Sequence, residues 1–405
     1  MKGSLPTSRL VPALALLSAA AAWSGCAESH PYEHDGDASV VDANSPDNQA
    51  VTDDSSIDVS SPDVGMLDDM GTVRDAGPPP NVALVAGDGV LIDAFVTTAG
   101  IVVVLRDQVL LVSRAGGELA RWTAPREITS AAFDGTYLGI ADGAALTTLT
   151  ASLEEQGDVF LTEPCASSVI VGQHRFVCGP SNDWDRVFYT YDLVTSMFVA
   201  SSEPYTYNGI PMRAVPGRDA FITVNTRSSP ADVHYYAVES SGVPTFINDS
   251  PYHGDFAVNG VYAFDSATAT HVVTHEGVLL RIDPCTEAHV YPSTCFVRDG
   301  AVGTLRSGEE YLALDTGADG NLYALVGRGA RWGVDSVCDD GCTGQRIDVS
   351  TRTVTASAGW NVVAAQLVTV RHDSVTGGMI AAGHRECDVF EGECAGWRVF
   401  HLAFE

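Results

Sequence analysis

The chain has 405 residues and a formal net charge of −30, from 52 acidic and 22 basic side chains. This charge disfavours nucleic acid and anionic membrane surfaces as partners, because both are negative themselves. Hydrophobic residues make up 45% of the chain, which is enough to bury a sizeable core. The acidity selects no ligand, and its simplest interpretation is solubility.

The first 26 residues have the composition of an export signal. Two basic residues precede an apolar stretch from Leu10 to Trp23, and small residues then lead to Cys26. The apolar stretch is too short to span a bilayer. The ending WSGC resembles the lipobox of bacterial lipoproteins, although Trp23 stands where that pattern has an aliphatic residue. The resemblance implies that Cys26 receives a lipid and anchors the chain to a membrane.

The compartment follows from the residues on either side of this cysteine. Ala27 is not the aspartate associated with inner-membrane retention, so the lipoprotein resemblance implies the outer membrane or the cell surface. Cleavage by an ordinary signal peptidase near Ala20–Ala22 is the alternative. That cleavage would give a secreted or periplasmic protein.

Residues 27–80 differ in composition from the rest of the chain. They hold 13 acidic residues and one basic residue, Arg74, with many Ser, Pro and Gly. Because this stretch has so little apolar surface to bury, folding could not offset the conformational entropy that ordering costs. We therefore expect a disordered acidic tether. The end of this stretch, RDAGPPP, resembles the stalk of bacterial surface lipoproteins. The predicted domains are therefore a signal peptide over 1–26, a tether over 27–80 and a folded domain over 81–405. The alternative for residues 27–80 is a spacer with no specific role.

The folded part is predicted to be all-β. No 3.6-residue apolar period is sustained, whereas runs rich in Val, Ile, Tyr, Phe and Thr recur between turn residues. Seven pairs of such runs follow one another, spaced by roughly 35 to 59 residues, which suits a four-stranded repeat unit. The pairs lie at 101–113, 136–150, 175–193, 220–239, 271–283, 322–349 and 379–402.

The order of elements around these pairs resembles the blades of WD40- and NHL-type β-propellers. In ITSAAFDGTYLGIADGAALTTLTASL, an innermost strand is followed by a second and a third. The resemblance implies a seven-bladed β-propeller of four-stranded antiparallel blades. Two stacked sandwich domains are the alternative fold.

The two ends of the folded part predict how the ring closes. The last recognisable strand, RVFHLAF, is a third strand, and NVALVA at 81–86 has no unit of its own. An open ring would leave an unpaired sheet edge, so we expect residues 81–86 to pair with that last strand.

Nine cysteines leave eight once Cys26 is set aside, and these eight are near neighbours in pairs. Because an exported protein favours oxidation, we expect local disulfides. The predicted pairs are Cys165 with Cys178, Cys285 with Cys295, Cys338 with Cys342, and Cys387 with Cys394. Three of them are expected on loops of one face, which suggests a pre-ordered surface for a protein or glycan ligand.

No cofactor is predicted. Acidic residues near the last two cysteine pairs offer hard oxygen ligands for calcium, but without EF-hand spacing. These residues are Asp335, Asp339, Asp340, Glu386, Asp388, Glu391 and Glu393, with Asp315 and Asp319 as a weaker pair. A zinc site built from Cys338, Cys342, Cys387 and Cys394 lacks the usual spacing.

No catalytic motif is present, and we name no catalytic residue. The chain has no GxSxG, HExxH or phosphate loop. His271 and His275 flank one hairpin turn without further support. The favoured interpretation is a non-enzymatic, lipid-anchored binding or scaffold protein of the cell envelope. The alternative is a lactonase-like metal-dependent hydrolase, which would need several Asp, Glu, Asn or His side chains converging in the propeller channel.

Overall fold

The structure is a computed structural model, and every regular element that it describes is a β-strand. It describes residues 83–180, 187–202, 212–215, 217–225, 232–251, 262–265, 270–273, 277–282, 296–317, 319–327, 342–360, 366–388 and 393–404. In this part of the chain there is no helical segment with the length and apolar character that crossing a bilayer requires. The predicted signal peptide and tether lie outside the described residues.

The strands form four-stranded antiparallel sheets, here called blades and numbered along the chain. Blade 1 comprises β2 (Leu91–Val96), β3 (Ile101–Leu105), β4 (Gln108–Val112) and β5 (Glu118–Thr123). Blade 2 comprises β6 (Ser130–Phe133), β7 (Tyr137–Ala141), β8 (Ala145–Thr150) and β9 (Glu155–Phe160). Blade 3 comprises β10 (Cys165–Val171), β11 (Arg175–Pro180), β12 (Tyr189–Asp192) and β13 (Met197–Ser201).

The later blades repeat this order. Blade 4 comprises β14 (Met212–Ala214), β15 (Ala220–Asn225), β16 (Asp232–Val238) and β17 (Pro244–Pro251). Blade 5 comprises β18 (Tyr262–Asp265), β19 (Thr270–Val273), β20 (Val278–Ile282) and β21 (Phe296–Ala301). Blade 6 comprises β22 (Glu310–Thr316), β23 (Leu322–Gly327), β24 (Cys342–Asp348) and β25 (Thr353–Trp360). Blade 7 comprises β26 (Gln366–Asp373), β27 (Gly378–Asp388), β28 (Glu393–Leu402) and β1 (Val85–Gly87).

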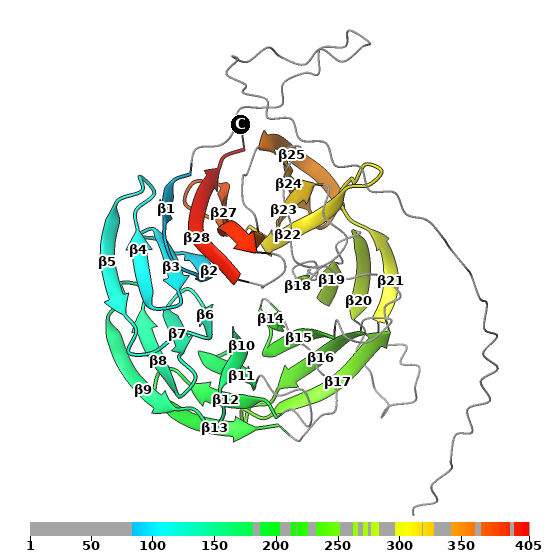
Figure 1. Cartoon of the computed structure of the whole chain (residues 1–405). Coiled ribbons are helices and arrows are strands. Elements are labelled where there is room, and N and C mark those ends of the chain that lie inside the picture. The colour runs from blue at the N-terminus through cyan, green and yellow to red at the C-terminus, as the bar shows by residue number, and fades with distance from the viewer. Residues whose placement is uncertain are drawn as a thin grey trace, which may run out of the picture. The chain divides into compact units, whose positions relative to one another are not determined.

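The blades surround a central channel. The first strand of each blade contacts the first strand of the next, in the order β2, β6, β10, β14, β18, β22, β26 and back to β2 (Figure 1). The prediction of an all-β propeller with four-stranded antiparallel blades is therefore confirmed. The strand pairs that the sequence singled out are the second and third strands of their blades. Stacked sandwiches, the alternative fold, would not form such a circuit.

The core lies between neighbouring blades rather than inside any one of them. Each apolar cluster of the described residues combines side chains from two adjacent sheets, such as Leu138 of blade 2 with Val102 of blade 1. A middle strand is covered on both faces and therefore reads as a continuous apolar run, as in Ile101–Leu105, where every residue is buried. Outermost strands such as β5 alternate between half-buried and exposed residues.

The ring closes by pairing between the two ends of the domain. The outer strand of blade 7 is β1, which runs antiparallel to β28 with Val85 opposite Val399 and Gly87 opposite Trp397. The Leu84 N–H also donates to the Val399 carbonyl at 2.7 Å. This pairing confirms the expected closure, although the strand begins at Val85 rather than at residue 81, and Asn81 and Val82 lie outside the described residues.

Ion pairs reinforce the boundary between blade 7 and blade 1, which we call the seam. The Arg114 Nε and Nη2 donate to the Asp373 carboxylate at 2.7 and 2.8 Å, and Nη2 also donates to the Thr97 carbonyl. The Asp373 side chain is fully buried. Burial alone would raise the pKa of Asp373, but hydrogen bonds from Arg114 and from the Val375 N–H lower it below its usual value.

Candidate functional site: the central channel

The channel contains a cavity of about 350 Å³. Its lining comes from the first strands of blades 1, 2, 3, 4, 6 and 7, largely from their carboxyl halves. Each first strand is the inner edge of its blade and pairs only with the second strand, so its free backbone edge as well as its side chains faces the channel. The polar residues of the lining are Asp93, Ser168, Arg213, Asp315, Thr316, Arg371 and His372.

One wall of the cavity carries three charged residues, which we call the acidic wall: Asp93, Asp315 and Arg371. The Arg371 Nη2 lies 3.2 Å from the Asp93 Oδ2, and its guanidinium stands over the Phe95 ring at 5.5 Å from the centroid. These residues come from blades 1, 6 and 7, which are neighbours in the ring. Arg371 is therefore the cation that these two carboxylates share in the described lining.

Asp315 is the less compensated carboxylate of this wall. Its Oδ2 accepts the His372 N–H at 2.7 Å. Burial raises the pKa of Asp315, against the opposing effects of Arg371 and of the backbone N–H groups of His372 and Thr316. A carboxylate in this environment gains from an additional cationic or hydrogen-bonding partner.

The neighbouring His372 ring is held by blade 6. It stacks on the Tyr323 ring with centroids 3.9 Å apart. The Tyr323 hydroxyl donates to the Asp319 Oδ2 at 2.8 Å, and burial and Asp319 together raise the pKa of Tyr323 to about 12. Asp319 also accepts from the Asn321 N–H, so its role is to close a turn and to fix Tyr323 beneath the imidazole.

Arg213 provides positive charge elsewhere in the lining. It lies on β14 of blade 4, three positions from blade 7 around the ring in one direction and four in the other. Its Nη1 donates to the Met212 carbonyl at 3.1 Å. Charged side chains of the described lining therefore come from blade 4 as well as from the acidic wall.

Apolar side chains fill the arc between these two groups. Blades 2 and 3 contribute Ala131, Ala132, Phe133, Val169 and Ile170. The Phe133 ring lies 5.9 Å from the Phe95 ring, so an aromatic pair joins this arc to the acidic wall. A cavity with an apolar body and a few charged groups is typical of a small-molecule site.

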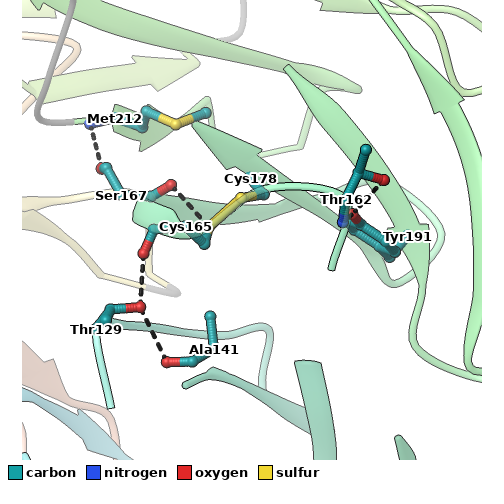
Figure 2. Close-up of a disulfide and its surroundings, with 8 residues drawn as sticks. All are labelled: Thr129, Ala141, Thr162, Cys165, Ser167, Cys178, Tyr191 and Met212. Carbon is teal, nitrogen blue, oxygen red and sulfur yellow. Dashed lines mark hydrogen bonds between the residues drawn. A yellow bond between two sulfur atoms is a disulfide. The ribbon is translucent and has the colours of Figure 1, made fainter. Parts of the chain in front are cut away.

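The structure tests two of the predicted disulfides and confirms both. Cys165, the first residue of blade 3, is bonded to Cys178 of the next strand, with 5.4 Å between their Cα atoms (Figure 2). Beside it, the Thr129 hydroxyl lies 2.7 Å from the Cys165 carbonyl and 3.2 Å from the Ala141 carbonyl. The disulfide is therefore tied to blade 2 as well as to its own blade.

The second confirmed disulfide joins Cys387 to Cys394. We expected these cysteines in a loop, and this detail was wrong, because β27 and β28 continue outward and place the two cysteines opposite each other in the ladder. Cys342 is disulfide-bonded, but Cys338 lies outside the described residues, as do Cys285 and Cys295. Cys26 also lies outside them.

The calcium hypothesis receives no support from the acidic residues that can be placed. Among the described residues, no group of three or more His, Cys, Asp or Glu side chains could hold a metal ion. Asp315 and Asp319 have the separate roles given above, and Glu386 is exposed beside Arg385. The other candidate ligands, and His275, have no described side chain.

The sequence analysis missed the charged residues of the channel other than Asp315. Asp93 interrupts the apolar run LIDAFV, and Arg371 ends a similar run in QLVTVRHD. A charged residue inside an otherwise apolar first strand was the available signal. This signal identifies channel residues only when the first strand of every blade is known. The sequence analysis identified a single first strand, ITSAAF.

The fold and the channel define the chain as a β-propeller. Similar solved structures include the β-propeller domain of Cps50 (Swd1) from Myceliophteria thermophila, with 10% identity, a TM-score of 0.50, and coverage of 79% of this chain and 99% of that one. A chain of a mitotic checkpoint complex has 11% identity and a TM-score of 0.52, covering 86% of this chain and 99% of its own length. At such low identity these likenesses establish the fold alone. No protein-family model and no curated protein matches the sequence.

Proposed function

We propose that the chain is a lipid-anchored, seven-bladed propeller that acts as a binding or scaffold protein on the extracytoplasmic side of the cell envelope. The observation that carries the binding role is the charge arrangement of the channel. Arg371 pairs with Asp93 and lies within electrostatic reach of Asp315, so both channel carboxylates already have a cationic neighbour. A guanidinium there repels a cation, so the arrangement favours binding over lactonase-like metal hydrolysis.

Three further features support the envelope assignment. The two disulfides are typical of an oxidising compartment. The sequence WSGC resembles a lipobox, and an acidic tether of 54 residues over 27–80 would hold the propeller away from the membrane. A separate observation supports the scaffold role. The mitotic checkpoint chain, which has the same fold, belongs to a complex, so this fold can serve as a component of an assembly.

Mass spectrometry of the mature amino terminus tests the anchor. The full chain is expressed in a bacterial host that processes lipoproteins, beside a Cys26→Ala variant. We expect an acylated amino-terminal Cys26 that partitions into detergent, and a variant that does not partition. An unmodified terminus upstream or downstream of Cys26 would contradict the anchor and favour a secreted protein.

Metal analysis of the same preparation tests the absence of a hydrolase centre. We expect less than stoichiometric calcium and zinc after dialysis, and no change in lactone hydrolysis when either metal is added. A tightly bound equivalent of metal that is lost in an Asp93→Ala variant would contradict the binding role and favour the hydrolase.

A further inference from the structure

We propose that the Cys387–Cys394 disulfide is a reversible redox site, which a dithiol reductant opens while the rest of the propeller stays folded. The pair lies where β27 and β28 extend beyond the other strands of blade 7. Neither the binding role nor the lipid anchor is needed for this chemistry. Three features of the pair support it: its position in the sheet, its exposure, and the side chain beside it.

The pair lies in a part of the hairpin that has no third strand beside it among the described residues. On the inner side, β26 pairs with β27 only as far as His384. On the outer side, β1 pairs with β28 only at Trp397–Val399. We call the end of the hairpin beyond these limits, Glu386–Asp388 with Glu393–Ala395, the hairpin tip. The hairpin tip has two strands, and two strands alone are marginally stable, so the disulfide is an important part of what holds them together.

The two confirmed disulfides differ in their access to solvent. Cys387 and Cys394 are each half-buried, whereas Cys165 and Cys178 are fully buried in the core between blades 2 and 3. Because exchange begins when a thiolate reaches a sulfur atom, exposed disulfides are the labile ones. A dithiol can therefore reach Cys387–Cys394 in the folded protein, whereas Cys165–Cys178 becomes accessible only when blades 2 and 3 separate.

The Gln366 side chain favours the reduced form of the site. Its Oε1 lies 3.1 Å from the Cys394 Sγ and 3.6 Å from the Cys387 Sγ. A disulfide has no S–H group to donate to this oxygen, whereas each thiol of the reduced form has one. The buried pair also has an acceptor nearby, because the Cys165 Sγ lies 3.3 Å from the Ser167 carbonyl (Figure 2). Access, and not hydrogen bonding, is therefore what distinguishes the two disulfides.

The chemistry is a two-step exchange. A thiolate of the dithiol attacks one sulfur of the pair, forms a mixed disulfide with it, and expels the other cysteine as a thiolate, which takes up a proton. The second thiol of the reductant then attacks the mixed disulfide, releases the remaining cysteine and closes the reductant's own disulfide. Overall, two electrons and two protons pass from the reductant to the protein. Without the cross-link, we expect the hairpin tip to fray while the three-stranded part of the blade stays paired.

Timed reduction of the full chain with dithiothreitol tests the proposal. Samples are quenched with an alkylating reagent, and peptide mass spectrometry measures the labelling of each cysteine. We expect Cys387 and Cys394 to be labelled at least about tenfold faster than Cys165 and Cys178. Circular dichroism should show an unchanged β-sheet signal while only the first pair is open. Equal rates, or opening of Cys387–Cys394 only together with loss of the β-sheet signal, would overturn the proposal.

Two substitutions test the role of Gln366. Gln366→Leu removes the acceptor, so the ratio of reduced to oxidised dithiothreitol that opens half of Cys387–Cys394 should rise about threefold. Gln366→Glu keeps an acceptor oxygen and should not raise this ratio. The ratio for Cys165–Cys178 is the internal control and should stay the same in both variants. An unchanged ratio for Cys387–Cys394 in Gln366→Leu would contradict the stabilisation of the reduced form.

Hydrogen exchange before and after reduction tests the structural consequence. Amides of the hairpin tip should exchange at least about tenfold faster in the reduced protein, while those of Ala382 and Val399, which are paired in the three-stranded part, should not change. Unchanged exchange at the hairpin tip would contradict the expected fraying. The same digests contain Cys26, so its acylation, which tests the anchor, is measured independently of the reduction.

Discussion

The seam and the boundary between blades 2 and 3 join neighbouring sheets by different means. At the seam, β1 of blade 7 leads directly into β2 of blade 1, but its place in blade 7 depends on pairing with β28, more than 300 residues later in the sequence. Two Arg–Asp pairs, Arg114 with Asp373 and Arg371 with Asp93, join the rest of the two blades. Blades 2 and 3 follow each other in the sequence. Their boundary has close apolar packing around Phe176, and a disulfide lies beside it.

The difference follows from what the covalent chain already supplies. A short connection keeps blades 2 and 3 near each other even when their packing is loose, so apolar contact is sufficient. At the seam the covalent link runs only from β1 to β2, so the other strands of blade 7 are held to blade 1 by non-covalent contacts, and closing so long a loop costs conformational entropy. Directional and charged contacts fix the register there, where a slip would move β1 out of the ladder.

Breaking the Arg114–Asp373 pair should have the largest effect. In an Arg114→Met variant the buried Asp373 carboxylate loses its arginine and keeps only weaker partners such as the Val375 N–H and His401, and we expect the free energy of unfolding to fall by about 3 kcal/mol. Urea denaturation measures the loss. The control is Arg121→Met, which breaks an exposed pair with Glu118 and should change stability within error. Equal losses in both variants would contradict the role of the seam pair.

Removing the disulfide of blade 3 should have the next largest effect. Replacing Cys165 and Cys178 with Ala opens a loop of 13 residues, for which chain entropy predicts a loss of about 3 kcal/mol. The Cys387/Cys394 double replacement opens a loop of 7 residues and should cost about 2 kcal/mol. Thermal unfolding of both variants compares them. A larger loss of stability in the Cys387/Cys394 variant would contradict this order. It would show that local contacts of the blade 7 hairpin, and not chain entropy, determine what each disulfide contributes.

Crowding the boundary between blades 2 and 3 sharpens the comparison further. A Cβ at Gly139 would lie about 2.5 Å from the Phe176 ring, which is fully buried, so Gly139→Ala should destabilise the protein by about 1–3 kcal/mol. Gly117→Ala is the control, because the nearest atom to its Cβ would be the Ser113 Oγ at 3.5 Å. A neutral Gly139→Ala variant would indicate that this boundary is loosely packed.

A small pH dependence should distinguish the seam as well. Burial lowers the pKa of His384, which lies on β27 near Arg106 of blade 1. The unfolded chain therefore takes up a proton as the pH falls through 6.5 while the folded chain does not, and stability is lost on the acid side. Urea denaturation at pH 7.5 and 5.5 should show a smaller loss for His384→Gln than for the parent. Burial lowers the pKa of His234 to about 4, so this residue contributes to the dependence of stability on pH in both proteins.

The sequence was sufficient to predict the architecture because the middle strands are buried on both faces. Runs such as IVVVL at Ile101–Leu105 stand out by composition, and each marks one blade. The closing strand was predictable for a different reason, since RVFHLAF lacked a fourth strand and NVALVA lacked a blade. The near-neighbour cysteines predicted Cys165–Cys178 and Cys387–Cys394.

The site could not be predicted in the same way. Asp93 and Arg371 are 278 positions apart, and their pairing depends on which residues of β2 and β26 face the channel. First strands are short and mixed in composition, as in LIDAFV, so neither their position nor their register is visible locally. The Arg114–Asp373 pair was missed for the same reason, because a single Arg in a turn has no sequence signature of its partner.

Hydrogen exchange of the peptide that contains Leu84 and Val85 tests the closed ring most directly. In the full chain, the Leu84 N–H donates to the Val399 carbonyl and β1 is paired along β28. We expect this amino-terminal peptide to exchange as slowly as the peptide containing Val399, and to lose protection together with it in the Arg114→Met variant. Exchange of Leu84 and Val85 within seconds in the parent protein, with Val399 still protected, would contradict the closure on which the channel depends.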